Sequence, residues 1–360
     1  MSILCIIISL RRGILFQLGK STVFGLDIGF GSVKVVQLKK SGKDISIVGF
    51  AREPIAEKSL QKTKILEKNK IQEALKKAVK SAKPHAITTK AVCAALPEHL
   101  VFTKVIELPK IKENALAKTI PYEAGEFMPI SLEETYLDWQ ILGDNPDKSK
   151  IEVLVVAAPK TLVDDYIDLV KQADLQLFAL ETKPISAVRA IAKNEKEGLA
   201  ILDIGAEASG IAIVDQGIIR LTGTVTVGAN MVDKALQTNL NLKPEDASKI
   251  KYESGLSFKT ETKTKEIIQQ ALAPITDELA HTIKYYQSRI KAEGKIAKIK
   301  LCGGGAAIQG IADYFSRQTG IHTEIGNPLV HLSKSSEKIL SKTDALPYTT
   351  AIGLALRELG

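Results

Sequence analysis

The sequence predicts an α/β protein in which one fold is used twice, as two lobes. The chain has 360 residues, which is long for a single core and favours two or more lobes. Apolar runs typical of strands alternate along it with amphipathic segments typical of helices. The triplet Asp-Ile-Gly ends one apolar run and opens another in each half, at Asp27 and at Asp203. Each occurrence predicts a strand, a glycine-bearing turn and a second strand, and the recurrence predicts a duplication.

In the first half, strands and helices are expected to alternate after the Asp27 hairpin. Apolar and alternating runs predict strands at Ile45–Phe50, Ala91–Leu96, Val101–Leu108, Thr135–Leu142 and Glu152–Ala158. Helical spacing of apolar residues predicts helices over the lysine-rich stretch Lys58–Lys83, over Lys112–Phe127 and over Thr161–Ala173. Pro121 is expected to kink or divide the second of these helices.

The second half is expected to repeat this alternation after the Asp203 hairpin. Strands are predicted at Ile218–Val227, Lys298–Cys302 and His322–Ile325. The stretch Asn230–Ala292 is predicted to be mostly helical, with one helix starting at Pro244 and a long helix at Ile267–Ile290 interrupted at Pro274. Further helices are predicted after Gly303-Gly304-Gly305, through Phe315, and at Tyr348–Leu359.

These elements divide the chain into four parts. Residues 1–22 form a leader, residues 23–96 and 174–197 the first lobe, residues 97–173 an α/β subdomain inserted into it, and residues 198–360 the second lobe. The leader holds an apolar run, Ile3–Leu10, followed by Arg11 and Arg12. This run is too short to span a bilayer, and its charges follow it, unlike those of a secretory signal. Three interpretations stay open: a flexible leader, a short membrane-touching helix, or an extension upstream of the true start.

The composition excludes several classes of protein. A content of 45% hydrophobic and 25% charged residues is typical of soluble globular chains. The three cysteines lie far apart, which argues against a disulfide framework or a zinc site and favours a reducing compartment. The net charge of +8 comes mostly from lysines. Because no aromatic residues interleave with the lysines of Lys58–Lys83, they predict a solvated helix face, or a mild attraction to an anionic membrane surface, and no nucleic-acid site.

The first hairpin carries residues suited to a phosphate. Gly29 and Gly31 let the backbone approach the anion, so that its N–H groups point at the oxygens. The hydroxyl and N–H of Ser32 and the ammonium of Lys34 add polar and positive contacts. The carboxylate of Asp27 is suited to holding the water shell of the Mg²⁺ that accompanies a nucleoside triphosphate.

The second hairpin and a glycine triplet complete the pattern. Asp203 is a second candidate for the metal ion, and Gly205 and Glu207 stand at the same turn. Gly303-Gly304-Gly305 follows a predicted strand and presents N–H groups without side chains, which suits a base or phosphate packed on the backbone. Each motif alone is also compatible with a plain hairpin or a loose turn. Together they predict a nucleotide held between two related lobes.

In these residues the chain resembles the actin-like ATPase superfamily, which includes Hsp70, sugar kinases and the division protein FtsA. The run from Asp27 to Lys34 resembles the first phosphate motif, Asp203-Ile204-Gly205 the second, and Gly303-Gly304-Gly305-Ala306 the adenosine motif. Within the superfamily the chain is most similar to the PilM family of type IV pilus assembly proteins. This similarity rests on Leu202-Asp203-Ile204-Gly205-Ala206-Glu207, on Ala95-Leu96-Pro97 leading to Glu107-Leu108-Pro109, on Glu123-Ala124 with Phe127-Met128-Pro129, and on Asp138-Trp139-Gln140.

The resemblance covers the chain from about Val23 onward and implies a duplicated actin-like ATPase fold. Two lobes would surround a nucleotide cleft that binds ATP and Mg²⁺, with weak or no ATPase activity, and an α/β subdomain of the FtsA and PilM type would be inserted in the first lobe. The resemblance further implies a cytoplasmic protein at the cytoplasmic face of the inner membrane. There it would bind the cytoplasmic tail of PilN and couple it to the pilus motor of twitching motility, with no nucleic-acid partner.

The resemblance also assigns further site residues. Glu181 resembles an acidic position that orients the attacking water in some relatives, and it suits a helix-capping carboxylate equally well. Gly228-Ala229 stands where the family usually has Gly-Gly, so one methyl group is expected to crowd the phosphate loop. Lys251 is expected near the base and ribose. The glutamate that accompanies it in the family is replaced here by Ser248, which leaves Glu245 as a nearby carboxylate.

Two other functions stay open on the same fold. A sugar or small-acid kinase needs a catalytic base at the acceptor hydroxyl, and no further carboxylate stands out from the helical background. A filament-forming division protein like FtsA normally ends in a membrane-binding helix after a linker. This chain ends at Leu356–Gly360, directly after a helix predicted to belong to the second lobe.

Overall fold

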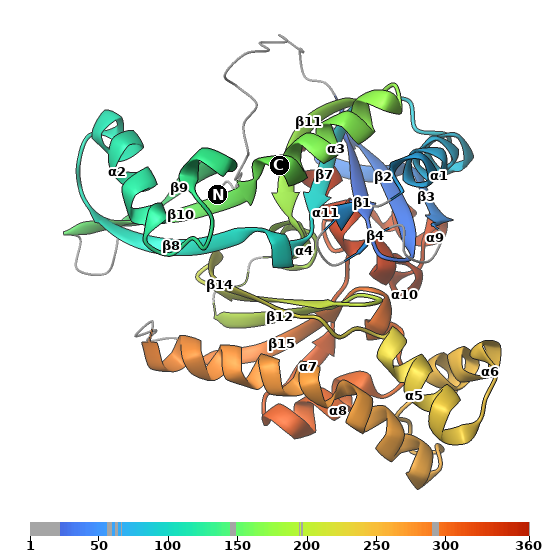
Figure 1. Cartoon of the computed structure of the whole chain (residues 1–360). Helices are drawn as coiled ribbons and strands as arrows, with labels where there is room; N and C mark the ends of the chain where they lie inside the picture. Colours follow the sequence, from blue (N-terminus) through green and yellow to red (C-terminus); the bar gives the residue numbers. More distant parts are fainter. Residues whose placement is uncertain are drawn as a thin grey trace. The chain divides into compact units, whose positions relative to one another are not determined.

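The computed structural model describes residues 22–55, 60–61, 64–65, 67–144, 149–193, 195, 197–289 and 295–359. Residues 1–21 of the predicted leader lie outside these residues. The chain divides into two compact units, one formed by Met1–Ser186 with Leu354–Gly360 and the other by Ala187–Gly353. Figure 1 colours both along the sequence.

The first unit is built on a six-stranded sheet with the order β11-β7-β1-β2-β3-β6. Its strands are β1 (Phe24–Ile28), β2 (Ser32–Ser41), β3 (Asp44–Pro54), β6 (Lys83–Pro84), β7 (Ala91–Leu96) and β11 (Gln176–Thr182). The first three form an antiparallel meander, whereas β7 runs parallel to β1 and β11 parallel to β7. The carboxyl ends of β1, β7 and β11 therefore lie at the same edge of the sheet.

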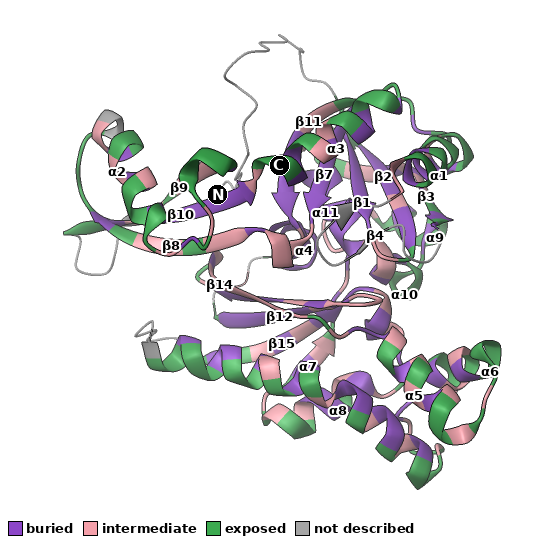
Figure 2. Cartoon of the chain, in the orientation of Figure 1, coloured by how far each residue is buried: buried purple, intermediate pink, exposed green. Residues whose placement is uncertain are grey.

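The helices of this sheet include α1 (Lys68–Ser81), α3 (Lys160–Gln172) and α4 (Lys183–Ile191), which directly follows β11. In α1, Ile71, Leu75 and Ala78 are buried toward β2 and β3, while its exposed face appears green in Figure 2 and carries lysines, as predicted. The helix is shorter than predicted. The residues before it instead pair as a small hairpin of β4 (Leu60–Gln61) and β5 (Lys64–Ile65).

A second, three-stranded sheet of the first unit lies within residues 97–173, the range for which an inserted subdomain is proposed. Its antiparallel strands have the order β8-β10-β9 and comprise β8 (Phe102–Pro109), β9 (Thr135–Asp144) and β10 (Lys150–Pro159). The helix α2 (Glu113–Gly125) buries Leu116, Ile120 and Ala124 in a core with residues of β8 and β10. Pro121, expected to kink or divide this helix, does not divide it, because Glu113–Gly125 form one helix.

The second unit repeats the strand pattern of the first. Its five-stranded sheet has the order β14-β13-β12-β15-β16, with β12 (Gly198–Ile204), β13 (Ser209–Asp215), β14 (Ile218–Val225), β15 (Ile296–Cys302) and β16 (Thr323–Ile325). The first three again form an antiparallel meander, and β15 and β16 again run parallel to its central strand. The predicted duplication of one α/β fold is therefore confirmed.

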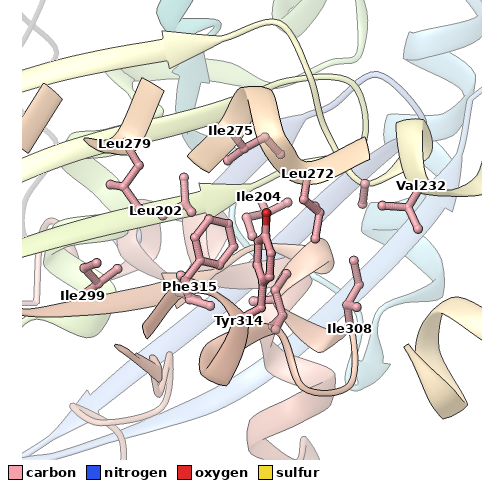
Figure 3. Close-up of a cluster of buried hydrophobic side chains, with 14 of the residues drawn as sticks. Leu202, Ile204, Val232, Leu272, Ile275, Leu279, Ile299, Ile308, Tyr314 and Phe315 are labelled. Carbon is pink, nitrogen blue, oxygen red and sulfur yellow. The ribbon is translucent and has the colours of Figure 1, made fainter. Parts of the chain in front are cut away.

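The helices of the second unit fix β12, the strand that carries Asp203. They comprise α5 (Asn230–Leu240), α6 (Pro244–Lys249), α7 (Thr262–Arg289), α8 (Ile311–Thr319), α9 (Lys334–Ile339), α10 (Lys342–Ala345) and the first part of α11 (Thr349–Leu356), whose last residues, from Leu354 on, belong to the first unit. Figure 3 shows Leu202 and Ile204 of β12 packed among Leu272 and Ile275 of α7 and Phe315 of α8. Within the described ranges, no helix is both long and apolar enough to cross a bilayer.

Candidate functional site

Asp27 lies between two lysines at the end of β1. It is the penultimate residue of the strand, it is only 4% exposed, and the antiparallel register places it opposite Lys34 on β2. Lys34 Nζ is 3.0 Å from Asp27 Oδ2, and Lys183 Nζ, at the start of α4, is 2.7 Å from Oδ1. Burial raises the pKa of this carboxyl group, but the two ammonium groups outweigh burial and hold the pKa well below its usual range.

In the turn after Asp27, other atoms pack closely against Gly29 but not against Gly31. The N–H of Gly29 donates to the carbonyl oxygen of Ser32 at 3.0 Å, and a Cβ on Gly29 would lie 3.4 Å from that oxygen and 3.5 Å from Lys34 Nζ. A Cβ on Gly31 would meet nothing within 4 Å. Ser32 is buried, and its hydroxyl accepts a hydrogen bond from Arg52 Nε at 3.1 Å. The turn therefore lies close to Lys34 at Gly29, while the Ser32 hydroxyl is held by Arg52.

Glu181 lies near the end of β11 in a buried ion pair. Arg357 Nη1 donates to Glu181 Oε1 at 2.6 Å, and the side chains of the two residues are 1% and 0% exposed, respectively. Sequence reasoning did not anticipate this partner for Glu181. The ion pair connects β11 to the residue that follows α11 in the first unit.

Asp203 holds the corresponding position at the end of β12, with different neighbours. The residue opposite it on β13 is Gly210, which has no side chain to offer. Thr350 Oγ1 donates to Asp203 Oδ2 at 3.4 Å. The two acidic hairpins thus share their backbone pattern but differ in what faces the carboxylate.

The glycine triplet packs against this carboxylate and its strand. A Cβ on Gly303 would lie 2.1 Å from Asp203 Oδ1, and the φ of Gly303 is +78°, a region that favours glycine. A Cβ on Gly305 would lie 2.2 Å from the Cγ2 atom of Ile204, whereas the nearest heavy atom to a Cβ on Gly304 is 4.0 Å away. Packing therefore requires Gly303 and Gly305, whereas it would allow a methyl group at Gly304.

The loop before α5 is hydrogen-bonded to the second hairpin turn. The N–H groups of Ala229 and Asn230 donate to the carbonyl oxygens of Gly205 and Ala206, both at 2.9 Å. A Cβ on Gly228 would lie 2.5 Å from the Ala206 oxygen, so the loop approaches the turn closely. The methyl group of Ala229, expected to crowd the phosphate loop, is buried with the apolar core of the second unit.

Glu207 is held at the first turn of α5. Asn230 Nδ2 donates to Glu207 Oε1 at 2.8 Å, and Lys234 Nζ lies 3.7 Å from Oε2. The side chain of Glu207 is 40% exposed. The hairpin turn and the start of α5 therefore form one polar surface.

Lys251 is buried beside a carboxylate that sequence reasoning missed. It lies in the π-helical turn Ile250–Ser254, forms an ion pair with Asp233 of α5, and places its Nζ 4.5 Å from the centroid of the Tyr252 ring. Asp233 Oδ1 is buried without a hydrogen-bond partner among the described residues. Glu245 is exposed in the first turn of α6. Asp233, not Glu245, is thus the carboxylate beside Lys251.

Each unit, taken by itself, holds groups of a kind that binds part of a nucleotide. The first unit offers two ammonium groups beside a glycine turn, and such groups form charge-assisted hydrogen bonds with phosphate oxygens. The second unit offers the carboxylate of Asp203, the open backbone at Gly304 and the buried oxygen of Asp233. A carboxylate oxygen of this kind accepts hydrogen bonds from hydroxyl groups such as those of ribose.

Comparison with known proteins supports this fold. The chain matches the family model described as type IV pilus assembly protein PilM over residues 25–359. It is 22% identical over 271 residues to the cell division protein FtsA of Bacillus subtilis, a match that covers 68% of this chain and 60% of that protein. It is 23% identical over 345 residues to FtsA of Enterococcus hirae, covering 84% of this chain and 78% of that protein.

Solved structures show the same architecture. A chain of a PilM–PilN type IV pilus biogenesis complex superimposes with a TM-score of 0.80 at 21% identity, covering 95% of this chain and 100% of that chain. MreB5 of Spiroplasma citri bound to AMPPNP superimposes with a TM-score of 0.55 at 16% identity, covering 92% of this chain and 94% of that chain. These similarities confirm the predicted actin-like fold.

Proposed function

Because this chain belongs to the family of the type IV pilus assembly protein PilM, we propose that it is an ATP-binding assembly protein of the pilus inner-membrane platform. The observation that carries this proposal is the family match over residues 25–359. The similarity to a chain solved as part of a PilM–PilN complex supports PilN as the partner. On this proposal the protein lies at the cytoplasmic face of the inner membrane, binds the cytoplasmic tail of PilN and connects it indirectly to the motor ATPase.

The two acidic hairpins are proposed to bind one ATP molecule. Lys34 and the Gly29 turn would contact the phosphates, Asp203 would hold Mg²⁺ through its water shell, and Gly304 and Asp233 would contact the adenosine. Bound ATP carries several negative charges, and these attract positively charged side chains such as that of Lys34. The ion pair between Glu181 and Arg357 supports weak or absent hydrolysis, because this carboxylate is already engaged by a cation.

Asp203→Asn is expected to weaken ATP binding about 10-fold or more, because it removes the charge proposed to hold the metal ion. It is also expected to abolish any ATP-dependent change in affinity for the PilN tail. The measurement is a fluorescence-anisotropy titration of a synthetic PilN tail peptide with ATP, with ADP and without nucleotide. The exposed Glu245 provides the control, since Glu245→Gln should leave both affinities unchanged. If the wild-type tail affinity is the same in all three conditions, the protein binds the tail without acting as a nucleotide switch.

Filament formation is a second candidate function, favoured by the similarity to FtsA over 84% of this chain. Sedimentation with and without ATP separates the two candidates. Pelleting only in the presence of nucleotide would support a filament, whereas a protein that stays in the supernatant in both conditions would support the assembly role.

A further inference from the structure

We propose that Lys183 is a second phosphate-binding residue of the first unit, and that Asp27 orients Lys34 and Lys183 toward the phosphates instead of binding the metal ion. This role rests on the proposed nucleotide-binding function and specifies how the first unit takes part in it. The ligand class is a nucleoside polyphosphate, recognised by two ammonium groups that share one buried carboxylate.

The contacts of Asp27 do not suit a metal ligand. Each of its carboxylate oxygens faces an ammonium group, at 3.0 Å for Lys34 and 2.7 Å for Lys183. A magnesium ion or its water shell would have to displace both ammonium groups, which would then lie beside a doubly charged cation. Like charges at such distances repel strongly, more so where a side chain is buried. The pair of lysines therefore occupies the place that a metal ion would need.

The second unit provides an internal comparison, because its strands repeat the same pattern. Asp203 occupies the same penultimate position in its strand as Asp27 does in β1, yet the residue opposite Asp203 is Gly210, where Asp27 faces Lys34. A hydroxyl group, that of Thr350, donates to Asp203. The lysine that faces Asp27 from the neighbouring strand thus has no counterpart at Gly210. The duplicated hairpins have therefore diverged at the residue opposite the aspartate.

The lysines, and not Asp27, reach the surface. The side chain of Asp27 is 6% exposed, whereas those of Lys34 and Lys183 are 14% and 26% exposed. Two ammonium groups and one carboxylate leave one net positive charge, and the guanidinium of Arg52 adds another at the Ser32 hydroxyl. Because the buried carboxylate already fixes both ammonium groups, little side-chain entropy remains to be lost when a phosphate binds.

The position of Lys183 follows from the topology of the sheet. It is the first residue after β11, and β7 separates β11 from β1 in a parallel arrangement. Its Nζ also lies 3.4 Å from the carbonyl oxygen of Ile28, at the end of β1. Lys34 reaches the same carboxylate from the antiparallel neighbour β2. The carboxyl end of β1 is therefore flanked by cations from both sides.

The experiment is a calorimetric titration of the full chain with ATP, ADP and AMP, each with and without MgCl₂. Lys183→Gln is expected to weaken ATP binding by about 10-fold to 100-fold, the usual range for a lost hydrogen bond between charged groups. The loss should shrink from ATP to ADP and vanish for AMP. Lys183→Arg should retain ATP binding, and Lys68→Gln, which removes an ion pair with Asp165 elsewhere in the same unit, should match wild type.

The metal dependence tests the role of Asp27 separately. In Asp27→Asn, MgCl₂ should change the ATP affinity by the same factor as in wild type. In Asp203→Asn, MgCl₂ should no longer change the ATP affinity. Thermal unfolding of each variant establishes that it is folded. Wild-type affinity of Lys183→Gln for ATP, or loss of the MgCl₂ effect in Asp27→Asn, would overturn the inference while leaving nucleotide binding intact. A wild-type chain that binds no ATP in any condition would instead overturn the proposed function, and this role with it.

Discussion

Arg357→Met is expected to lower the free energy of unfolding by about 3–5 kcal/mol, the usual cost of leaving one partner of a buried ion pair without the other. The side chain of Arg357 is 1% exposed and that of Glu181 is fully buried, and the guanidinium donates to the carboxylate at 2.6 Å. Without the guanidinium, the charge of Glu181 would lie in the interior near the end of β11. Equilibrium unfolding in urea, followed by circular dichroism, measures this loss.

Two further variants control this result. Replacing both partners, as Glu181→Leu with Arg357→Met, should recover most of the lost free energy, because an apolar pair of similar volume carries no desolvation cost. Lys90→Gln removes the exposed ion pair with Asp174 and should leave the urea midpoint unchanged. A single Arg357→Met variant as stable as wild type would show that the ion pair does not stabilise β11.

Gly303→Ala is expected to destabilise the second unit by about 2–4 kcal/mol and to weaken ATP binding about 10-fold or more. Its new methyl group would lie 2.1 Å from Asp203 Oδ1, and the backbone at Gly303 has a φ of +78°. Either Asp203 or the loop must move, so the effect combines backbone strain with displacement of the carboxylate proposed to hold the metal ion. Urea unfolding and an ATP titration measure the two parts.

Alanine substitutions at two other glycines distinguish backbone strain from the close approach to Asp203. Gly320→Ala meets the same kind of backbone, with a φ of +69°, but no heavy atom lies within 4 Å of its Cβ, so it reports the cost of backbone conformation alone. Gly304→Ala would approach no heavy atom closer than 4.0 Å and should leave stability close to wild type. If Gly303→Ala costs no more than Gly320→Ala and binds ATP normally, the close approach to Asp203 has no consequence.

Local patterns predicted the parts of the fold that depend on neighbours in sequence. The two Asp-Ile-Gly hairpins follow from apolar runs interrupted by glycine. The long helix α7 was predicted from its helical spacing, but the predicted interruption at Pro274 was wrong, because Thr262–Arg289 form one continuous helix. Pro274 is tolerated on the exposed side of the helix, because the carbonyl oxygen of Gln270, which loses its N–H donor there, belongs to an exposed residue and can accept from water. The duplication followed from the recurrence of the hairpin alone.

The features that depend on pairing between strands far apart in sequence could not be predicted. The strand β11 was not predicted, because its apolar run, Leu177–Leu180, is short and its parallel partner β7 is far away in sequence. Without β11, neither the contact of Lys183 with Asp27 nor that of Glu181 with Arg357 could be inferred. Asp233 was missed for a similar reason. A carboxylate in the first turn of a helix is usually solvated, and the sequence did not reveal that Asp233 forms an ion pair with Lys251 and has a buried Oδ1 atom.

Hydrogen–deuterium exchange of the full chain during a titration with Mg-ATP tests the central claim most directly, namely that both acidic hairpins bind the same nucleotide. Binding should slow exchange in the turns at Gly29–Ser32 and Gly205–Ala208 and in the triplet Gly303–Gly305, and all three segments should share one midpoint concentration. Slowed exchange in only one hairpin, or separate midpoints for the two, would contradict a single nucleotide bound by both halves of the duplicated fold.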